Sequence, residues 1–189
     1  MANSYVEEIT NAWFKTKGFL VTKNVWFQKS GPKRSWTDID VLAFKPGELV
    51  ICSCKAFLGN KKAERAAADL KKWFDEAEDF ITRDFRHQHL KEGARLIKLI
   101  VVDTPGSKKI FNEVKLYGIE IIQLRSCYKE IISNIIEGWR KSNPHYAKEG
   151  KFWLKSPQMS WGKEEGMVER LTIALLAWDY LKEDLVKGI

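Results

Sequence analysis

Residues 36–55 read WTDIDVLAFKPGELVICSCK, and this stretch predicts an antiparallel β-hairpin. Two runs rich in β-forming residues, Trp36–Phe44 and Glu48–Phe57, are separated by a short connection. The connection contains Pro46 and Gly47, a pair that is typical of a tight turn. We therefore expect the two runs to pair with each other as neighbouring strands.

Polar residues interrupt both apolar strands. Side chains alternate between the two faces of a strand, so Asp38 and Asp40 are predicted to share a face. On the second strand, Ser53 and Lys55 share a face for the same reason. A charged group inside an apolar strand is costly unless it is paired or binds a metal. Pairing should bring Asp40, Ser53 and Lys55 together at one end of the sheet, either as a functional site or as a salt bridge at the sheet edge.

The sequence on either side of the hairpin predicts further helices and strands. Upstream, an N-cap at Ser4 and apolar residues at helical spacing predict a helix that ends at Gly18, and a strand follows over Phe19–Phe27. Downstream, the predicted elements are a helix over 61–84, a buried strand over 96–102, a short helix over 108–117, a buried strand over 119–124 and a helix from 128 to 139. This order predicts an α/β fold with a mixed central sheet flanked by helices.

The C-terminal third has a different character. Residues 1–127 are predicted to form the α/β core, and residues 128–189 a small, mainly helical extension. Within the extension, residues 141–163 are rich in basic and aromatic side chains, and residues 164–187 have the periodicity of a long amphipathic helix. We expect this last helix to pack on the core or to form a dimer interface.

The composition favours a folded protein with a polyanionic partner. Of the 189 residues, 44% are hydrophobic, which excludes the disordered class. The formal charge of +7 favours binding to nucleic acids through neutralisation of phosphates. Three cysteines without CxxC spacing exclude a disulfide framework and a zinc knuckle. Because no signal-peptide pattern and no apolar run of ~20 residues is found, we expect a cytoplasmic protein without a membrane partner.

This part of the sequence resembles the PD-(D/E)xK nuclease superfamily. It shares the order of an aspartate, a hairpin and a tripeptide that ends in lysine, with helices on either side. Within it, the pattern is similar to that of archaeal Holliday-junction resolvases and restriction-endonuclease-like proteins. The matching segments are Val6–Phe19, Asp38–Ala43 and Val50–Lys55, and the resemblance covers about the first two thirds of the chain. It implies a restriction-endonuclease-like fold for the core.

The resemblance also implies a role for each residue that matches the motif. Asp40 corresponds to the metal-binding aspartate, and Lys55 to the lysine beside the attacking water. Glu7 corresponds to a metal-binding acid of the first helix, although an acid in a first turn equally well compensates the helix dipole. Mg²⁺, or Mn²⁺ in its place, prefers oxygen ligands and lowers the pKa of a bound water. The implied activity is that of an endonuclease that hydrolyses phosphodiester bonds in branched or duplex DNA.

The sequence departs from the family pattern at Ser53, where the motif has an acid. A hydroxyl is a poorer Mg²⁺ ligand than a carboxylate, so either another acid replaces it or the site is inactive. Some relatives with Ser-x-Lys use an acid of the following helix, and here Asp69 has the matching distance from Lys55, with Glu64 as the alternative. The departure leaves a second function open, that of a catalytically inactive nuclease fold that binds DNA or acts as a scaffold.

Basic and aromatic residues next to the hairpin form the predicted DNA-binding surface. Lys29, Lys33, Arg34 and Trp36 lead directly into Asp38, and Trp26 precedes them. Lysine and arginine bind phosphates, and aromatic side chains stack on exposed bases. A homodimer would place two active sites on two DNA strands. A protein-interaction domain with no role on nucleic acids is the remaining interpretation.

Overall fold

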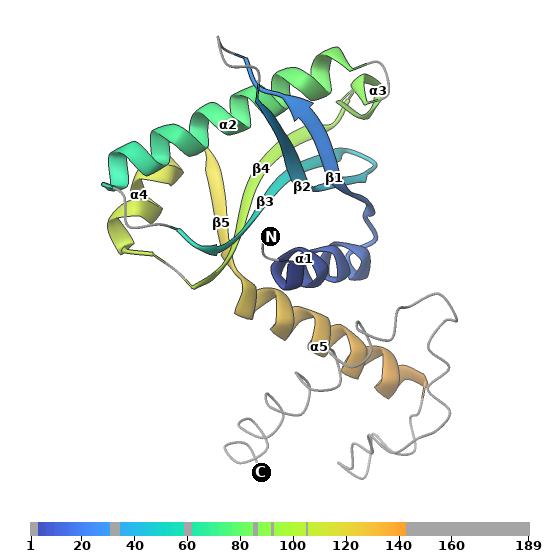
Figure 1. Cartoon of the computed structure of the whole chain (residues 1–189). Coiled ribbons are helices and arrows are strands. Elements are labelled where there is room, and N and C mark those ends of the chain that lie inside the picture. Colours follow the sequence, from blue (N-terminus) through green and yellow to red (C-terminus); the bar gives the residue numbers. More distant parts are fainter. Residues whose placement is uncertain are drawn as a thin grey trace. The chain divides into compact units, whose positions relative to one another are not determined.

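The computed structural model describes residues 4–30, 35–58, 62–84, 87–91, 93–104 and 106–142. By their contacts, the residues of the chain divide into two compact units, Met1–Cys127 and Tyr128–Ile189. All strands of the described residues lie in the first unit (Figure 1).

The predicted hairpin is formed by β2 (Trp36–Lys45) and β3 (Glu48–Phe57), which pair antiparallel. In the connection, Gly47 has a φ of 84°, a left-handed conformation that glycine adopts without a clash of a Cβ. Proline before such a glycine suits the same kind of tight turn. The turn predicted from Pro46 and Gly47 is therefore present.

Three further strands complete a five-stranded mixed sheet in the order β1-β2-β3-β4-β5. β1 (Leu20–Gln28) pairs antiparallel with β2, whereas β4 (Arg95–Thr104) and β5 (Ile119–Gln123) continue the sheet in parallel from β3. Parallel neighbours need crossover connections, and these contain α2 (Ala63–Arg83) between β3 and β4 and α4 (Lys108–Leu116) between β4 and β5.

Helices cover both faces of the sheet. α2 and α4 pack on one face, and α1 (Ser4–Thr16) contacts the strands from the other (Figure 1). The predicted α/β fold with a mixed central sheet flanked by helices is therefore confirmed. The sequence pattern does not predict the one-turn helix α3 (Gln88–Lys91), and α5 (Leu124–Ser142) begins directly after β5, before the predicted start at residue 128.

An apolar core fills the space between the sheet and the layer formed by α2 and α4. Burial of one large aliphatic or aromatic side chain contributes about 1.5–3 kcal/mol, so this layer provides much of the stability of the sheet. Its fully buried side chains include Phe27, Ile39, Leu49, Ile51, Phe74, Ile81, Ile100 and Ile119.

The alternation of side chains is interrupted at one level of β1 and β2. Ile39 and Leu42 both belong to the core on the α2 side, although strict alternation would place them on opposite faces. Opposite this level on β1, Asn24 has a φ of 54°, in the left-handed region. Because Ile39 lies on the α2 side, Asp38 and Asp40 on either side of it share the opposite face, as alternation predicts, and the interruption follows Asp40, whose carboxylate contacts Ser53 and Cys54 of β3.

Parts of the predicted C-terminal extension lie outside the described residues. The helix predicted from 128 to 139 is part of α5. The remainder of the basic and aromatic segment after Ser142, and the amphipathic helix predicted over 164–187, are not described. Among the helices of the described residues, none is long and apolar enough to cross a membrane.

Candidate functional site

Asp40 lies where β2 and β3 separate. The pairing of the two strands ends at Val41 and Cys52, although both strands continue beyond this level. The backbone N–H of Cys54 donates a hydrogen bond of 2.6 Å to Oδ2 of Asp40, and the Ser53 hydroxyl donates another of 3.1 Å. The carboxylate thus provides β3 with an acceptor at the point where β2 turns away.

Lys55 brings a positive charge to the same carboxylate. Its Nζ lies 3.7 Å from Oδ2 of Asp40, within the range of an ion pair. The side chain of Lys55 is 39% exposed, whereas that of Asp40 is 11% exposed and Ser53 is buried. The structure therefore brings the three residues together, as the sequence predicts, with a fixed carboxylate inside and an ammonium that reaches solvent.

Two further carboxyl groups are affected by the charge of Asp40. Burial raises the pKa of Glu7, and repulsion by Asp40 and Asp38 raises it further, against a smaller opposing effect of Lys23. Burial also raises the pKa of Asp38, as does repulsion by Asp40, while the positive charge of Lys55 acts in the opposite direction. The ionised forms of both acids are disfavoured first by burial and then by the neighbouring carboxylates at this end of the sheet.

The charge at this end of the sheet is suited to a cation. Two lysines, Lys23 and Lys55, lie among four acids, Glu7, Glu8, Asp38 and Asp40. No three His, Cys, Asp or Glu side chains among the described residues are arranged as a ready-made metal site. Mg²⁺, however, retains several waters and is often held by one or two carboxylates. Asp40 together with Glu7 or Asp38 is thus a donor set whose chemistry fits this ion.

Ser53 holds Asp40 in place. Its hydroxyl is used as a donor to Oδ2, and its side chain is buried beneath the carboxylate. The contacts from Ser53, Cys54 and Lys55 are all made to Oδ2, and none of them uses Oδ1. These three contacts thus fix the carboxylate through Oδ2.

The two acids predicted to replace the missing one both lie on α2. Glu64 forms an ion pair of 2.6 Å with Lys109 of α4, and this hydrogen-bonded contact lowers the pKa of Glu64. Asp69 is exposed on the same helix. The charges that shift the pKa of Glu7 come from α1, β1 and β2, and neither acid of α2 is among them. A metal-binding role for Asp69 or Glu64 remains a prediction.

The predicted DNA-binding residues lie around the connection between β1 and β2. Lys33 and Arg34 fall outside the described residues. Lys29 is half-buried, and its backbone N–H donates to the carbonyl of Ser35 across the connection. Trp36 is 65% exposed at the start of β2. Of the two predicted residues that the structure describes, Lys29 and Trp36, the tryptophan is thus the more exposed.

Tyr5 and Asp103 form a contact next to the site that the sequence does not predict. The Tyr5 hydroxyl donates a 2.6 Å hydrogen bond to Oδ2 of Asp103, and this bond raises the pKa of Tyr5. Tyr5 precedes Glu7 by two residues on α1, and Asp103 follows Val102, the neighbour of Lys55 in the sheet. The partners are 98 residues apart, so no local pattern could have joined them.

The three cysteines are free and buried. Burial raises the pKa of Cys52 well above its ordinary value, and a hydrogen bond with Cys54 raises it further. Because the thiolate is the reactive form, a thiol with a raised pKa is a poor nucleophile near neutral pH. The environment of Cys52 therefore argues against cysteine catalysis.

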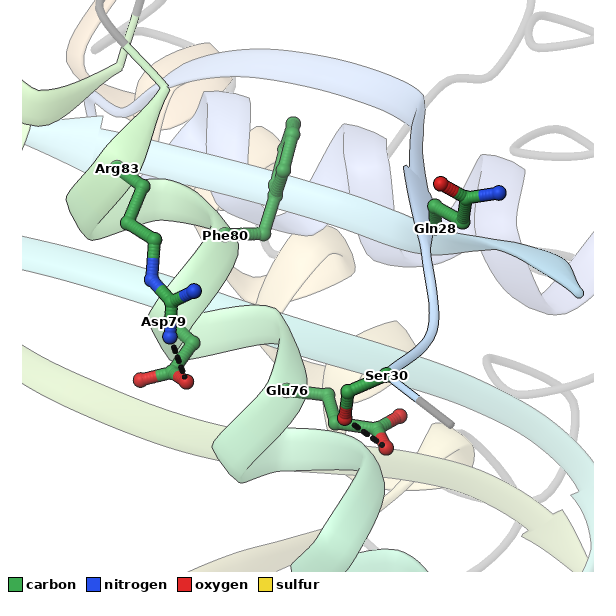
Figure 2. A pocket seen from close by; sticks show the side chains of 6 residues that line it. All are labelled: Gln28, Ser30, Glu76, Asp79, Phe80 and Arg83. Atoms are coloured by element: carbon green, nitrogen blue, oxygen red, sulfur yellow. Dashed lines mark hydrogen bonds and ion pairs between the residues drawn. The ribbon is translucent and has the colours of Figure 1, made fainter. Parts of the chain in front are cut away.

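A separate pocket of about 200 Å³ lies between the end of β1 and α2 (Figure 2). Its charged groups are paired with one another, since Arg83 contacts Asp79 at 2.7 Å and Ser30 donates to Glu76 at 3.0 Å. Asp40 and its neighbours do not line it, so this pocket is distinct from the acid site. The lining residues are Gln28, Ser30, Glu76, Asp79, Phe80 and Arg83.

Comparisons with known proteins add little to this geometry. No family model matches the sequence, and no curated protein matches it. A crystal structure of a protein of unknown function, AF1548, is similar to this chain with 23% sequence identity and a TM-score of 0.47. The similarity covers 72% of this chain and 67% of that one.

Proposed function

We propose that this protein is a DNA endonuclease that hydrolyses phosphodiester bonds with a divalent metal ion, Mg²⁺ or Mn²⁺. The observation that carries the proposal is the fixed carboxylate of Asp40, held by Ser53 and the N–H of Cys54 beside the ammonium of Lys55. The resemblance of this motif to the PD-(D/E)xK nuclease superfamily supports the same function.

Asp40, with Glu7 or Asp38, would hold the metal. When bound, the ion would supply an activated water and stabilise negative charge on the phosphate. The raised pKa values of Glu7 and Asp38 support this assignment, because a cation among crowded acids relieves their repulsion. Asp69, or Glu64 as the alternative, would be a further carboxylate from α2.

Lys55 would act on the nucleophile or on the phosphate. Its ammonium is close to Asp40 and reaches solvent, so it can donate to a water or a phosphate oxygen that approaches from outside. Ser53 has a positioning role, since its hydroxyl keeps the Asp40 carboxylate oriented. This division of roles accounts for a serine at a position where the superfamily motif has an acid.

DNA is the proposed substrate because the chain carries a formal charge of +7, which favours a polyanion. Lys29, Lys33, Arg34 and Trp36 are the proposed contacts near the site. We also propose a cytoplasmic protein that acts as a homodimer, because a two-fold arrangement of two sites can cut both strands of a duplex.

A catalytically inactive nuclease fold that binds DNA or serves as a scaffold is the second candidate. Two observations favour it: Ser53 replaces an acid, and the described residues contain no ready-made site with three metal ligands. In this function, Asp40 and Lys55 would form a structural ion pair.

Cleavage assays separate the two candidates. The full chain is incubated with duplex, single-stranded and branched DNA in the presence of Mg²⁺, Mn²⁺ or EDTA. We expect metal-dependent cutting that falls by at least about 100-fold in Lys55→Ala, because general acid–base groups contribute factors of this size. Lys115→Ala, which removes an exposed lysine of α4, is the matched control and should cut like the unmodified protein. Binding to DNA without cutting under every metal condition would support the second candidate.

Thermal unfolding gives a readout of metal binding that does not depend on activity. Mg²⁺ should raise the Tm of the unmodified protein, because an ion that binds only the folded state stabilises it by about 2.7 kcal/mol at 100 times its Kd. The Asp40→Asn variant should show little of this shift, whereas Lys115→Ala should show all of it. Equal shifts in all three proteins would contradict a metal site at Asp40.

A further inference from the structure

Two tryptophans form an exposed pair on the ribbon of β1 and β2. Trp26 is 59% exposed and Trp36 is 65% exposed, so the core does not account for either side chain. The register pairs Trp26 with Asp38, and Gln28 with Trp36. The two indoles are therefore diagonal neighbours, a relation that separates residues by roughly 7–8 Å and lies within reach of aromatic side chains.

Both indoles point away from α2. The residues on either side of Trp26, Val25 and Phe27, are buried in the core on the α2 side, so Trp26 projects from the opposite face. Thr37, which follows Trp36, accepts a hydrogen bond of 3.4 Å from a tryptophan of α2, so Trp36 also projects from the opposite face. The pair thus lies on one exposed face of the β1–β2 ribbon, and we call this face the aromatic surface.

This aromatic surface is adjacent to the acid site. Asp38 is the direct partner of Trp26 on β2, and its pKa is affected by the charge of Asp40. Trp36 and Asp40 are four residues apart on β2, which corresponds to about 13 Å of strand. A ligand that covers both indoles would therefore extend toward Asp40 and Lys55.

The two indole faces indicate which part of a nucleic acid binds there. An exposed indole has no charge to pair with a phosphate, whereas a nucleobase offers an uncharged face that stacks on it. In a duplex, the faces of the bases are covered by neighbouring base pairs, so only an unpaired base can offer its face to Trp26 or Trp36. The chemistry of the surface thus selects a strand with exposed bases.

We propose that Trp26 and Trp36 bind unpaired bases by stacking, so that the substrate carries a single-stranded segment next to the bond that is cut. The part of this proposal that concerns cutting rests on the nuclease function proposed above, whereas the stacking does not depend on catalysis. It also narrows the substrate from DNA in general to DNA with unpaired bases at the site.

Equilibrium binding of the full chain to a fluorescent single-stranded oligonucleotide of roughly 12 nucleotides, in EDTA, tests the stacking. We expect Trp26→Ala and Trp36→Ala each to weaken binding by at least about fivefold, the lower range for loss of one base–aromatic stack. Binding of a duplex of the same length should not change. Leu20→Ala, which removes an exposed apolar side chain at the other end of β1, is the matched control and should leave both affinities unchanged.

An abasic strand of the same length separates bases from phosphates. It carries the same charge without any base, so it should bind equally to the unmodified protein and to the variant with both substitutions. Trp26→Phe and Trp36→Phe retain an aromatic face and should restore most of the affinity for the normal strand. Thermal unfolding of each variant checks that these surface changes leave the fold intact.

Several results would overturn the stacking. These are an unmodified protein that does not bind the single strand, a double variant with unchanged affinity, and an abasic strand that binds as tightly as the normal one. Because β1 is an edge strand, a self-association that the double variant abolishes, with single-strand affinity intact, would assign the surface to a second copy of the chain instead. Binding in EDTA and cleavage in Mg²⁺ are measured separately. Stacking without cleavage would contradict only the proposed nuclease function. Cleavage without stacking would contradict only the proposal that Trp26 and Trp36 bind unpaired bases.

Discussion

The two halves of the β2–β3 hairpin differ in the hydrogen-bond partners of their backbone N–H and C=O groups. In the half near the turn, Val41–Lys45 pairs with Glu48–Cys52, and most of these side chains are buried and apolar. In the other half the strands separate, and the carboxylate of Asp40 accepts hydrogen bonds from β3. The paired half stabilises the sheet by hydrophobic burial, while the open half holds charged groups in fixed positions.

The acids Asp38 in the open half and Glu7 beside it on α1 have ionised forms that the folded protein disfavours. The pKa values of Glu7 and Asp38 are raised first by burial and then by neighbouring carboxylates, so their ionised forms destabilise the folded state. Sites that bind ligands often contain such unfavourable charge, which the ligand then compensates. The comparison therefore predicts a loss of stability for substitutions in the paired half and at Asp40, and a gain for substitutions of Glu7 and Asp38.

The largest expected effect is in the paired half. Ile51 is fully buried in the core on the α2 side, so Ile51→Ala should lower the free energy of unfolding by about 2–5 kcal/mol through lost burial and the cavity left behind. Urea denaturation followed by circular dichroism measures this loss. The exposed position of Leu20 provides the control, because Leu20→Ala removes a similar side chain that is not buried. Equal losses at the two positions would show that the paired half is not the stabilising one.

A smaller loss is expected at Asp40. Asp40→Ala removes the acceptor for the buried Ser53 hydroxyl and the Cys54 N–H, and unsatisfied groups of this kind cost about 1–3 kcal/mol. Asp40→Asn keeps an acceptor oxygen and should lose less stability, while it should abolish the effect of Mg²⁺. If the alanine variant proved as stable as the asparagine variant, the bonds from β3 would contribute nothing measurable.

The smallest effect, and one of opposite sign, is expected at Glu7 and Asp38. An acid whose pKa is higher in the folded than in the unfolded state contributes stability below its unfolded pKa, and this stability is lost as the pH rises through the folded pKa. Glu7→Gln and Asp38→Asn should therefore raise the Tm at pH 7, and the gain should shrink as the pH falls through the raised pKa of each folded acid and vanish below the ordinary values of 4.5 and 3.8. Thermal unfolding across this pH range measures it. A gain that is independent of pH would mean that ionisation is not its cause.

The fold was largely predictable because its signals are local. The runs around Ile39 and Ile51, the turn at Gly47 and the helical periodicity of α2 each span a few residues, and each predicts the element that the structure contains. Simple alternation did not predict the interruption between Asp40 and Leu42, because the sequence of β2 does not report the left-handed conformation of Asn24 on the neighbouring strand. The early start of α5 at Leu124 was missed because β5 passes into the helix without a connecting loop.

The candidate site was predictable only in part. The convergence of Asp40, Ser53 and Lys55 follows from a hairpin motif within one stretch of sequence, and the structure contains it. Spacing along the chain could not decide whether Asp69 or Glu64 of α2 replaces the missing acid. The ion pair of Glu64 with Lys109 depends on how α2 and α4 pack.

The sequence by itself determined the type and order of the elements and the polar motif of the hairpin. These follow from periodicity and turn chemistry, which act over short distances along the chain. Only the tertiary structure decided that Glu7 of α1 affects Asp38 of β2, that Tyr5 bonds to Asp103, and that Trp26 and Trp36 share one exposed face. Such contacts depend on strand register and on the packing of helices against the sheet, and both are set by burial of the whole apolar surface at once.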